Sequence, residues 1–125
     1  MSNFISLARA ISMTENYRDN MESILSPGYK DKGILPICET FDRASFETLL
    51  EETDAAFIRV YLGMDKDLKI RIIAVAADSA NQDILPAGNS SNTAFSKNFA
   101  DDGGNIVEDG IRCPDTCPPP SPLNP

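Results

Sequence analysis

Three cysteines are the residues whose types and spacing could do chemistry in this chain. Cys113 and Cys117 stand in the segment CPDTC, with three residues between them, and Cys38 ends the apolar stretch ILPIC far earlier. The pair is spaced one residue too widely for the C-x-x-C motif of redox and zinc sites. Proline follows each member of the pair and biases its backbone toward an extended conformation. The open alternatives are a disulfide, a metal site, a reactive thiol, or thiols with no chemical role.

Loop-closure entropy ranks the disulfides that these thiols can form. Bonding Cys113 to Cys117 stabilises the fold by about 2 kcal/mol in the chain-entropy model. A bond from Cys38 to either of them closes a loop of about 76 to 80 residues, which is worth about 4.5 kcal/mol in the same model. A metal would need all three thiolates and a fourth ligand from Asp or water. For Cys38 itself, we expect a buried and inert side chain.

The segment after the cysteines, PPPSPLNP, is more than half proline. Such a sequence favours a polyproline II helix, which is stiff before binding and therefore loses little entropy when it docks in a groove. The alternative is a solvated C-terminal extension. The apolar side chain near its end favours packing on the same domain or on a neighbouring subunit. The candidate partner-binding residues are Pro118, Pro119, Pro120, Pro122 and Leu123.

Acidic residues are the other candidates for chemistry. The segment DDGGNIVEDG carries Asp101, Asp102, Glu108 and Asp109, but it does not follow the register of an EF-hand calcium loop. Paired carboxylates that hydrolyse glycosides need a cleft that a chain of this length rarely builds. We therefore interpret these residues as solvated loop carboxylates, and we predict neither a metal site nor a cofactor.

Composition excludes several large classes of function. The chain has 125 residues and no histidine, so it contains no Ser-His-Asp or Cys-His mechanism of its own. Its net charge is −8, and its basic residues are scattered among aspartates. Nucleic acids and anionic membrane surfaces both attract clustered Lys and Arg, so we expect neither as a partner.

The longest uninterrupted apolar run is IIAVAA, far shorter than the roughly 20 residues of a membrane-spanning helix. The N-terminal MSNFISLARAISM lacks the basic region and the cleavage site of a signal peptide. We expect the cytoplasm as the default compartment, and export without a signal stays open.

Two amphipathic helices are predicted. Over residues 4–25, a spacing of about 100° per residue gathers the apolar side chains into two adjoining stripes. Over residues 42–52, Asp42 is placed to cap the helix, and Phe41 and Phe46 have the spacing of a hydrophobic staple. The stripe of the second helix contains Phe46, Leu49 and Leu50. The stripes of the first helix contain Ala10, Met13, Tyr17, Met21 and Ile24, and beside them Phe4, Leu7, Ile11 and Leu25.

The strands are predicted at 34–38, 55–63, 68–77 and within 105–112. The segments AAFIRVYLG and LKIRIIAVAA alternate in the manner of strands, and the polar turn MDKD joins them into a hairpin. Ile58, Val60 and Leu62 are expected on one face of this hairpin, which we expect to be the centre of the fold. The result is an α+β class, with a small, mostly antiparallel sheet. Residues 1–112 form one domain, which includes a long polar loop at 78–104, and 113–125 form the Cys/Pro-rich tail.

The combination of ILPICETF, YLGMD and DGIRCPDTCPPPSPLN resembles small uncharacterised bacterial proteins over most of the chain. This resemblance implies a bacterial source but no activity, cofactor or partner.

We therefore expect a non-enzymatic interaction or structural protein, self-assembling or bound to a protein partner, whose tail docks on that partner or on a neighbouring subunit. The alternative is a small thiol-dependent redox or metal-handling protein that uses Cys38, Cys113 and Cys117. An enzyme that works through Asp or Glu without histidine is a third class, which the sequence favours least.

Overall fold

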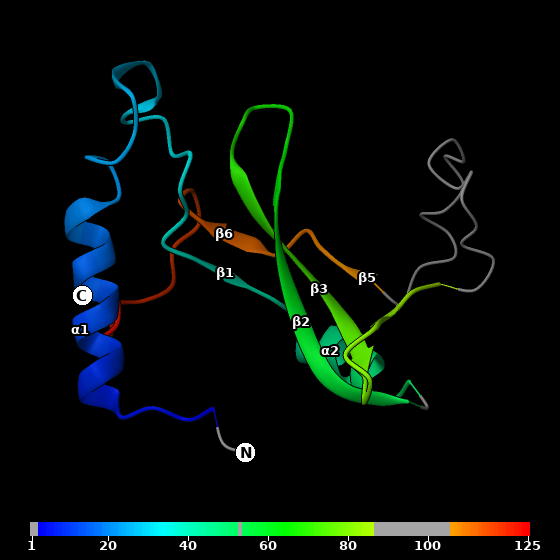
Figure 1. Ribbon diagram of the computed structural model, residues 1–125. Coiled ribbons are helices and arrows are strands. Elements are labelled where there is room, and N and C mark those ends of the chain that lie inside the picture. The colour runs from blue at the N-terminus through cyan, green and yellow to red at the C-terminus, as the bar shows by residue number, and fades with distance from the viewer. Residues whose placement is uncertain (1–2, 53, 87–105) are drawn as a thin grey trace.

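The computed structural model describes residues 3–52, 54–86 and 106–125. Over these residues the chain forms two α-helices, a short 3-10 helix and six strands (Figure 1). All strand pairs are antiparallel, in a two-stranded sheet and a four-stranded sheet. The predicted α+β class with a small antiparallel sheet is therefore confirmed. The bounds are α1 (Leu7–Asn20), η1 (Pro27–Tyr29), β1 (Cys38–Thr40), α2 (Arg43–Leu50), β2 (Ala55–Met64), β3 (Ile70–Asp78), β4 (Asp83–Ile84), β5 (Ile106–Val107) and β6 (Ile111–Cys113).

The hairpin of β2 and β3 is the centre of the fold, as predicted. Its turn is fixed by Asp65, whose Oδ1 accepts the backbone N–H groups of Asp67 at 2.9 Å and Lys69 at 3.0 Å. The second strand of the hairpin, β3, also pairs with β4 and β5, whereas β2 pairs with β3 alone among the described residues. Consequently β3 is an inner strand and β2 is an edge strand.

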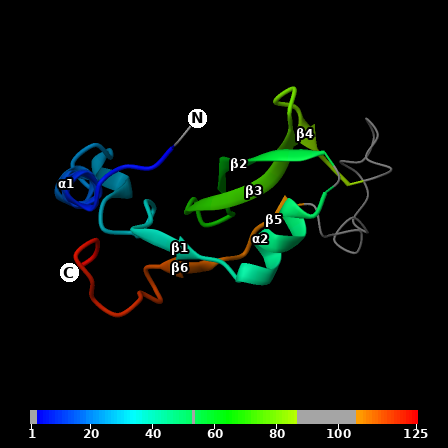
Figure 2. The ribbon, with the colours of Figure 1, turned by 90° about the horizontal axis from the view of Figure 1, so that it is seen from below.

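The hydrophobic core lies at the base of the hairpin, under α2 (Figure 2). Leu49 of α2 is fully buried and packs with Ala74, Ala76 and Val107. The predicted staple is present, because the rings of Phe41 and Phe46 lie 5.7 Å apart. The prediction for Leu50 was wrong: this residue is 56% exposed, because it stands about 100° around the helix from the fully buried Leu49.

The second sheet pairs β1 with β6 and brings the C-terminal part of the chain back to residues 38–40. Its central residue is Arg112, which is buried although it is charged. The guanidinium group donates to the carbonyls of Ile70 at 2.9 Å, Gly33 at 2.7 Å, Ile34 at 2.7 Å and Pro114 at 3.1 Å. One side chain therefore joins the segment before β1, the start of β3 and the segment after β6.

Three local predictions differ from the structure. The strand expected at 34–38 begins only at Cys38, because Pro36 lies in the middle of that segment and lacks the N–H that a ladder needs. The single strand expected within 105–112 is two strands, β5 and β6, which pair with different sheets. Asp109, which lies between them, has a φ of 69°, a left-handed conformation that interrupts an extended chain. The predicted loop at 78–104 contains β4, and its residues 87–104 lie outside the described part of the chain.

The first helix, α1, is shorter than predicted, and among the described residues no other element buries its side chains. It begins after Ser6, whose hydroxyl accepts the N–H of Arg9 at 3.1 Å, and it ends at Asn20. None of its 14 residues is buried, and Met13 is 55% exposed. Figures 1 and 2 show α1 beside the sheets rather than stacked on one of them. Among the described residues, no helix is long and apolar enough to cross a membrane.

Candidate functional site

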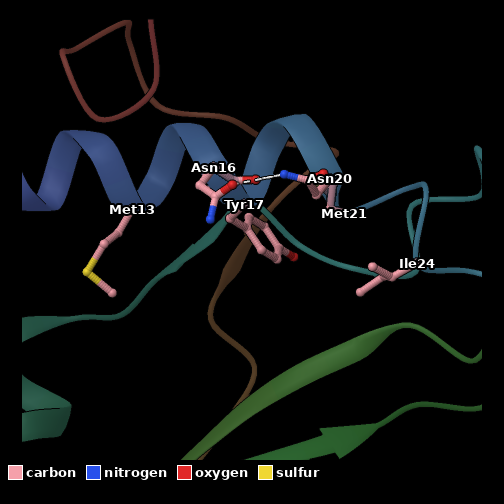
Figure 3. Close-up of a pocket in the computed structure, with 6 residues that line it drawn as sticks. All are labelled: Met13, Asn16, Tyr17, Asn20, Met21 and Ile24. Atoms are coloured by element: carbon pink, nitrogen blue, oxygen red, sulfur yellow. Dashed lines mark hydrogen bonds between the residues drawn. The ribbon is translucent and has the colours of Figure 1, made fainter.

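The uncovered side of α1 lines an open apolar hollow of about 310 Å³. Figure 3 shows the side chains of Met13, Tyr17 and Ile24 on one side of the helix. On the same side, Asn20 donates to the backbone carbonyl of Asn16 at 2.8 Å, which satisfies that amide within the helix. The residues that line this hollow are Met13, Asn16, Tyr17, Asn20, Met21 and Ile24.

A second hollow of about 330 Å³ adjoins the first, and Tyr17 lines both. Its other walls come from the segment around β1 and from the hairpin, so it lies between elements that are distant in sequence. We call the two hollows together the Tyr17 groove. The residues of the second hollow are Tyr17, Leu35, Pro36, Ile37, Cys38, Glu39, Leu62, Ile70 and Ile72.

Tyr17 fixes the position of α1 across this groove. Its hydroxyl donates to the carbonyl oxygen of Pro36 at 2.6 Å. Partial burial raises the pKa of Tyr17. The positive charge of Arg112 lowers this pKa by a smaller amount, and the negative charge of Glu22 raises it further. The phenol therefore stays protonated at neutral pH and remains a hydrogen-bond donor. The contact is polar, so it orients the helix without covering the apolar side chains beside it.

The hairpin contributes an apolar face that is covered at one end only. Ile58 lies at the base, where it packs against the core. Farther along the same face, Val60 is 55% exposed and Leu62 is 72% exposed. We expected all three to share one buried face, and for Val60 and Leu62 that expectation was wrong. They lie beyond the reach of the short helix α2, on the part of the face that borders the Tyr17 groove.

The outer edge of β2 carries no uncompensated charge. Arg59 is the one charged residue within this strand, and it forms an ion pair with Asp83. The Tyr61 hydroxyl also donates to Asp83, and this hydrogen bond is the largest influence on the pKa of that carboxyl group, which it lowers. Burial opposes it, and the hydrogen bond and charge of Arg59 lower the pKa further. Soluble proteins commonly protect exposed edges with charges or proline, whereas β2 contains no proline and its one charge is paired with Asp83.

The three cysteines meet at the β1–β6 sheet. Cys113 and Cys117 form a disulfide, with their Cα atoms 4.4 Å apart. Cys38 is free, half-buried, and stands directly opposite Cys113 in the strand register. It also lines the Tyr17 groove. The sequence identified these residues as candidates but could not decide between their pairings, because pairing depends on how β1 meets β6.

The tail returns to the first helix. Arg18 of α1 donates to the carbonyl oxygen of Leu123 at 2.6 Å, and a short turn bridges Ser121 and Asn124. Figure 1 shows the C-terminus beside α1. The candidate residues Pro118, Pro119, Pro120, Pro122 and Leu123 are all exposed. The ordered contact in this structure is thus with the chain's own helix.

Of the four acidic candidates, the structure describes Glu108 and Asp109. Glu108 and Asp109 are exposed, and Asp101 and Asp102 lie outside the described residues. Within the described ranges, no group of three or more Cys, Asp or Glu side chains is arranged to hold a metal ion.

Two important residues were not singled out from the sequence. In the sequence, Arg112 looks like an ordinary charged residue in a polar segment. In the structure, three segments converge on it, and it becomes a buried donor to four carbonyls. Glu39 is likewise buried, with its side chain 1% exposed beside Arg71. The alternation in CET and IRC is too short to reveal which side of each strand faces inward.

Comparison with known proteins gives no further information: no protein-family model, curated protein or solved structure matches this chain.

Proposed function

We propose that this chain is a non-enzymatic interaction protein that self-assembles by covering the Tyr17 groove with a second copy. The observation that carries the proposal is α1, an amphipathic helix of 14 residues with none buried. Apolar surface of this extent on a small soluble domain is typical of an interaction site. A protein partner of other sequence is the alternative occupant.

The arrangement favours a second copy because the groove adjoins a self-complementary edge. The strand β2 is ten residues long and is paired on one side only among the described residues. Two such strands can pair antiparallel about a two-fold axis, which makes the same surface available on both subunits. Leu62 belongs to β2 and also lines the Tyr17 groove. Pairing of two β2 strands would therefore bury apolar surface of the strand and of the groove together.

The tail has a supporting role in this proposal. It is held near α1 by the hydrogen bond from Arg18 to Leu123, and its prolines are exposed. We propose that the tail contacts the second copy, in keeping with the stiffness of a proline-rich segment.

The test is the molar mass in solution, measured by size-exclusion chromatography with light scattering over a range of concentrations. We expect a mass that rises from the 13.6 kDa monomer toward a dimer. Leu62→Lys should weaken association at least tenfold, because burying a leucine contributes about 1.5–3 kcal/mol. The matched control is Leu50→Lys, since Leu50 is 56% exposed on α2 and lies outside the groove.

A chain truncated after Cys117 tests the tail while keeping the disulfide. We expect it to associate more weakly than the full chain. A constant monomer mass at every concentration overturns self-assembly, and an equal effect of Leu62→Lys and Leu50→Lys overturns the groove as its site. If truncation leaves the association unchanged, the tail has no part in it.

A second candidate, a thiol-dependent redox protein, is favoured by one observation: the free Cys38 stands opposite a disulfide-bonded Cys113. The metal-handling form of this alternative is not proposed, because two of its three thiolates are bonded to each other. Thiol counting under denaturing conditions should find one free thiol before reduction and three after it. Three free thiols in the unreduced protein would overturn this candidate.

For the compartment, we keep the cytoplasm as a default proposal, with signal-independent export as the alternative. The disulfide favours export, or else a transient bond, since stable disulfides are rare in reducing compartments.

A further inference from the structure

Cys113 has two cysteine neighbours, one bonded to it and one opposed to it in the strand register. It is bonded to Cys117, and the register of β1 and β6 places Cys38 directly across from it. Residues that oppose each other in an antiparallel pair project to the same face, with Cβ atoms about 4.5–5.5 Å apart. Disulfides join Cα atoms about 4.4–6.8 Å apart and Cβ atoms about 3.5–4.5 Å apart. Opposed residues of paired strands meet the first range, and a small approach of their Cβ atoms meets the second.

We propose that these residues form a thiol–disulfide exchange site in which Cys113 is the shared sulfur. The Cys38 thiol loses its proton, and its thiolate attacks the Sγ atom of Cys113. The Cys38–Cys113 bond forms as the Cys113–Cys117 bond breaks, and Cys117 leaves as a thiolate that takes up a proton. The number of disulfides and free thiols is unchanged, so the step needs no external oxidant or reductant. This inference rests on the second candidate function.

Burial determines which sulfur each attacking group can reach. Cys113 is 1% exposed, so a thiol from solution has little access to it. Cys38 is its opposed residue in the β1–β6 pair, and just beside this pair the Ile37 N–H donates to the Cys113 carbonyl at 2.7 Å. Cys117 is exposed, so it is the sulfur at which a small thiol from solution can enter or leave. The Cys113 sulfur therefore has one partner inside the protein, Cys38, and one at the surface, Cys117.

Exchange would move the free thiol from the groove to the surface and would change how the tail is cross-linked. Before it, the free thiol is Cys38, which lines the Tyr17 groove. After it, the groove is free of thiol, and the free thiol is Cys117 on the surface. The tail would then lose the disulfide that ties Cys117 back to β6 and would keep the hydrogen bond between Arg18 and Leu123. One chemical step thus couples the groove to the tail.

Disulfide mapping of two variants in a glutathione redox buffer tests the inference. In Cys117→Ser, which alters an exposed side chain, we expect Cys38 and Cys113 to join: the protein loses both free thiols, stays free of glutathione, and yields a Cys38–Cys113 peptide by mass spectrometry. The matched control is Cys113→Ser, in which Cys38 and Cys117 are not opposed. We expect its thiols to stay unlinked to each other, either free or mixed with glutathione.

The inference is overturned if Cys117→Ser keeps two free thiols or takes up glutathione at both sites under conditions that fully oxidise Cys113 and Cys117 in the unaltered chain. It is also overturned if Cys113→Ser links Cys38 to Cys117 as readily as Cys117→Ser links Cys38 to Cys113, because the pairing would then not depend on strand register.

Thiol counting of the unaltered chain separates this failure from that of the redox candidate. One free thiol together with a failed exchange leaves that candidate standing, whereas three free thiols remove both. Light scattering of the same samples reports independently on self-assembly.

Discussion

Along the hairpin face that carries Ile58, Val60 and Leu62, the base is covered by α2, whereas the tip lies beside α1 and stays open. The helix at the base has eight residues and buries Leu49 completely. The helix beside the tip has 14 residues and buries none. An amphipathic pattern therefore predicts that a helix forms, but burial also needs an apposed surface at the right distance. The difference between these two regions is the physical basis for placing an interaction site at the tip.

The largest expected effect is at the base. Leu49→Ala should lower the free energy of unfolding by about 2–5 kcal/mol, because it removes a fully buried side chain and leaves a cavity. The measurement is urea denaturation of dilute protein, followed by circular dichroism. The matched control at the tip is Met13→Ala, for which we expect a change within about 0.5 kcal/mol, as is usual for exposed positions. Similar losses for the two variants would contradict the distinction between base and tip.

Arg112 joins three segments beside the tip, namely the residues before β1, the start of β3 and the residues after β6, and its replacement should have the next largest effect. Arg112→Met leaves the carbonyls of Gly33, Ile34, Ile70 and Pro114 without this donor, which we expect to cost about 2–4 kcal/mol. Arg43→Met is the control, since Arg43 is 90% exposed and pairs with Glu47 on the same helix. We expect the control to change stability by less than about 1 kcal/mol. An equally mild Arg112→Met would show that the packing of these three segments does not depend on this side chain.

Tyr17→Phe sharpens the description of the tip. It removes the hydroxyl that donates to Pro36 and keeps the apolar ring, so we expect a loss of about 0.5–1.5 kcal/mol at most. The informative measurement is amide hydrogen exchange. We expect faster exchange in α1 and unchanged exchange in α2. Uniform acceleration in both helices would mean that α1 belongs to the same cooperative unit as the base.

The smallest effect concerns the charge balance at the β2 edge. The hydrogen bonds from Tyr61 and Arg59 lower the pKa of Asp83 below 3.8, so the folded state binds a proton less readily than the unfolded state there. Its contribution to stability is present above that unfolded-state value and is lost as the pH falls through the lower folded-state value.

Asp83→Asn should accordingly flatten the acid end of the stability profile, measured by urea denaturation below about pH 5. The variant also leaves Arg59 without its ion pair, so we expect weaker self-association at neutral pH. If the dependence of stability on pH is unchanged below about pH 5, Asp83 does not have this role. If self-association is unchanged at neutral pH, association does not require the charge of Arg59 to be paired.

The sequence predicted those features that local pattern determines. The hairpin, its Asp65 turn and the Phe41–Phe46 staple all follow from residues that are neighbours in the chain or within one turn of helix. The α+β class follows from them. The predicted helix at 4–25 was too long at both ends, because Ser6 caps it at the start and the chain continues after Asn20 as turns.

The features that sequence could not predict depend on which segments meet. Cys38 faces Cys113 only because β6 returns to β1, and Arg112 is buried only because three segments converge on it. Leu62 and Leu50 have the pattern of core residues, but their exposure depends on the length and position of α2. The groove could not be derived from periodicity, since an apolar stripe looks the same whether or not another element covers it.

Hydroxyl-radical footprinting as a function of protein concentration tests the central claim most directly, because it reports on the side chains of the Tyr17 groove themselves. We predict that Met13 and Met21 lose reactivity as the concentration rises, while Tyr29, which is 48% exposed and lies outside the groove, keeps its reactivity. Reactivity of Met13 and Met21 that stays the same relative to Tyr29 at every concentration would contradict the claim that a second copy covers this groove.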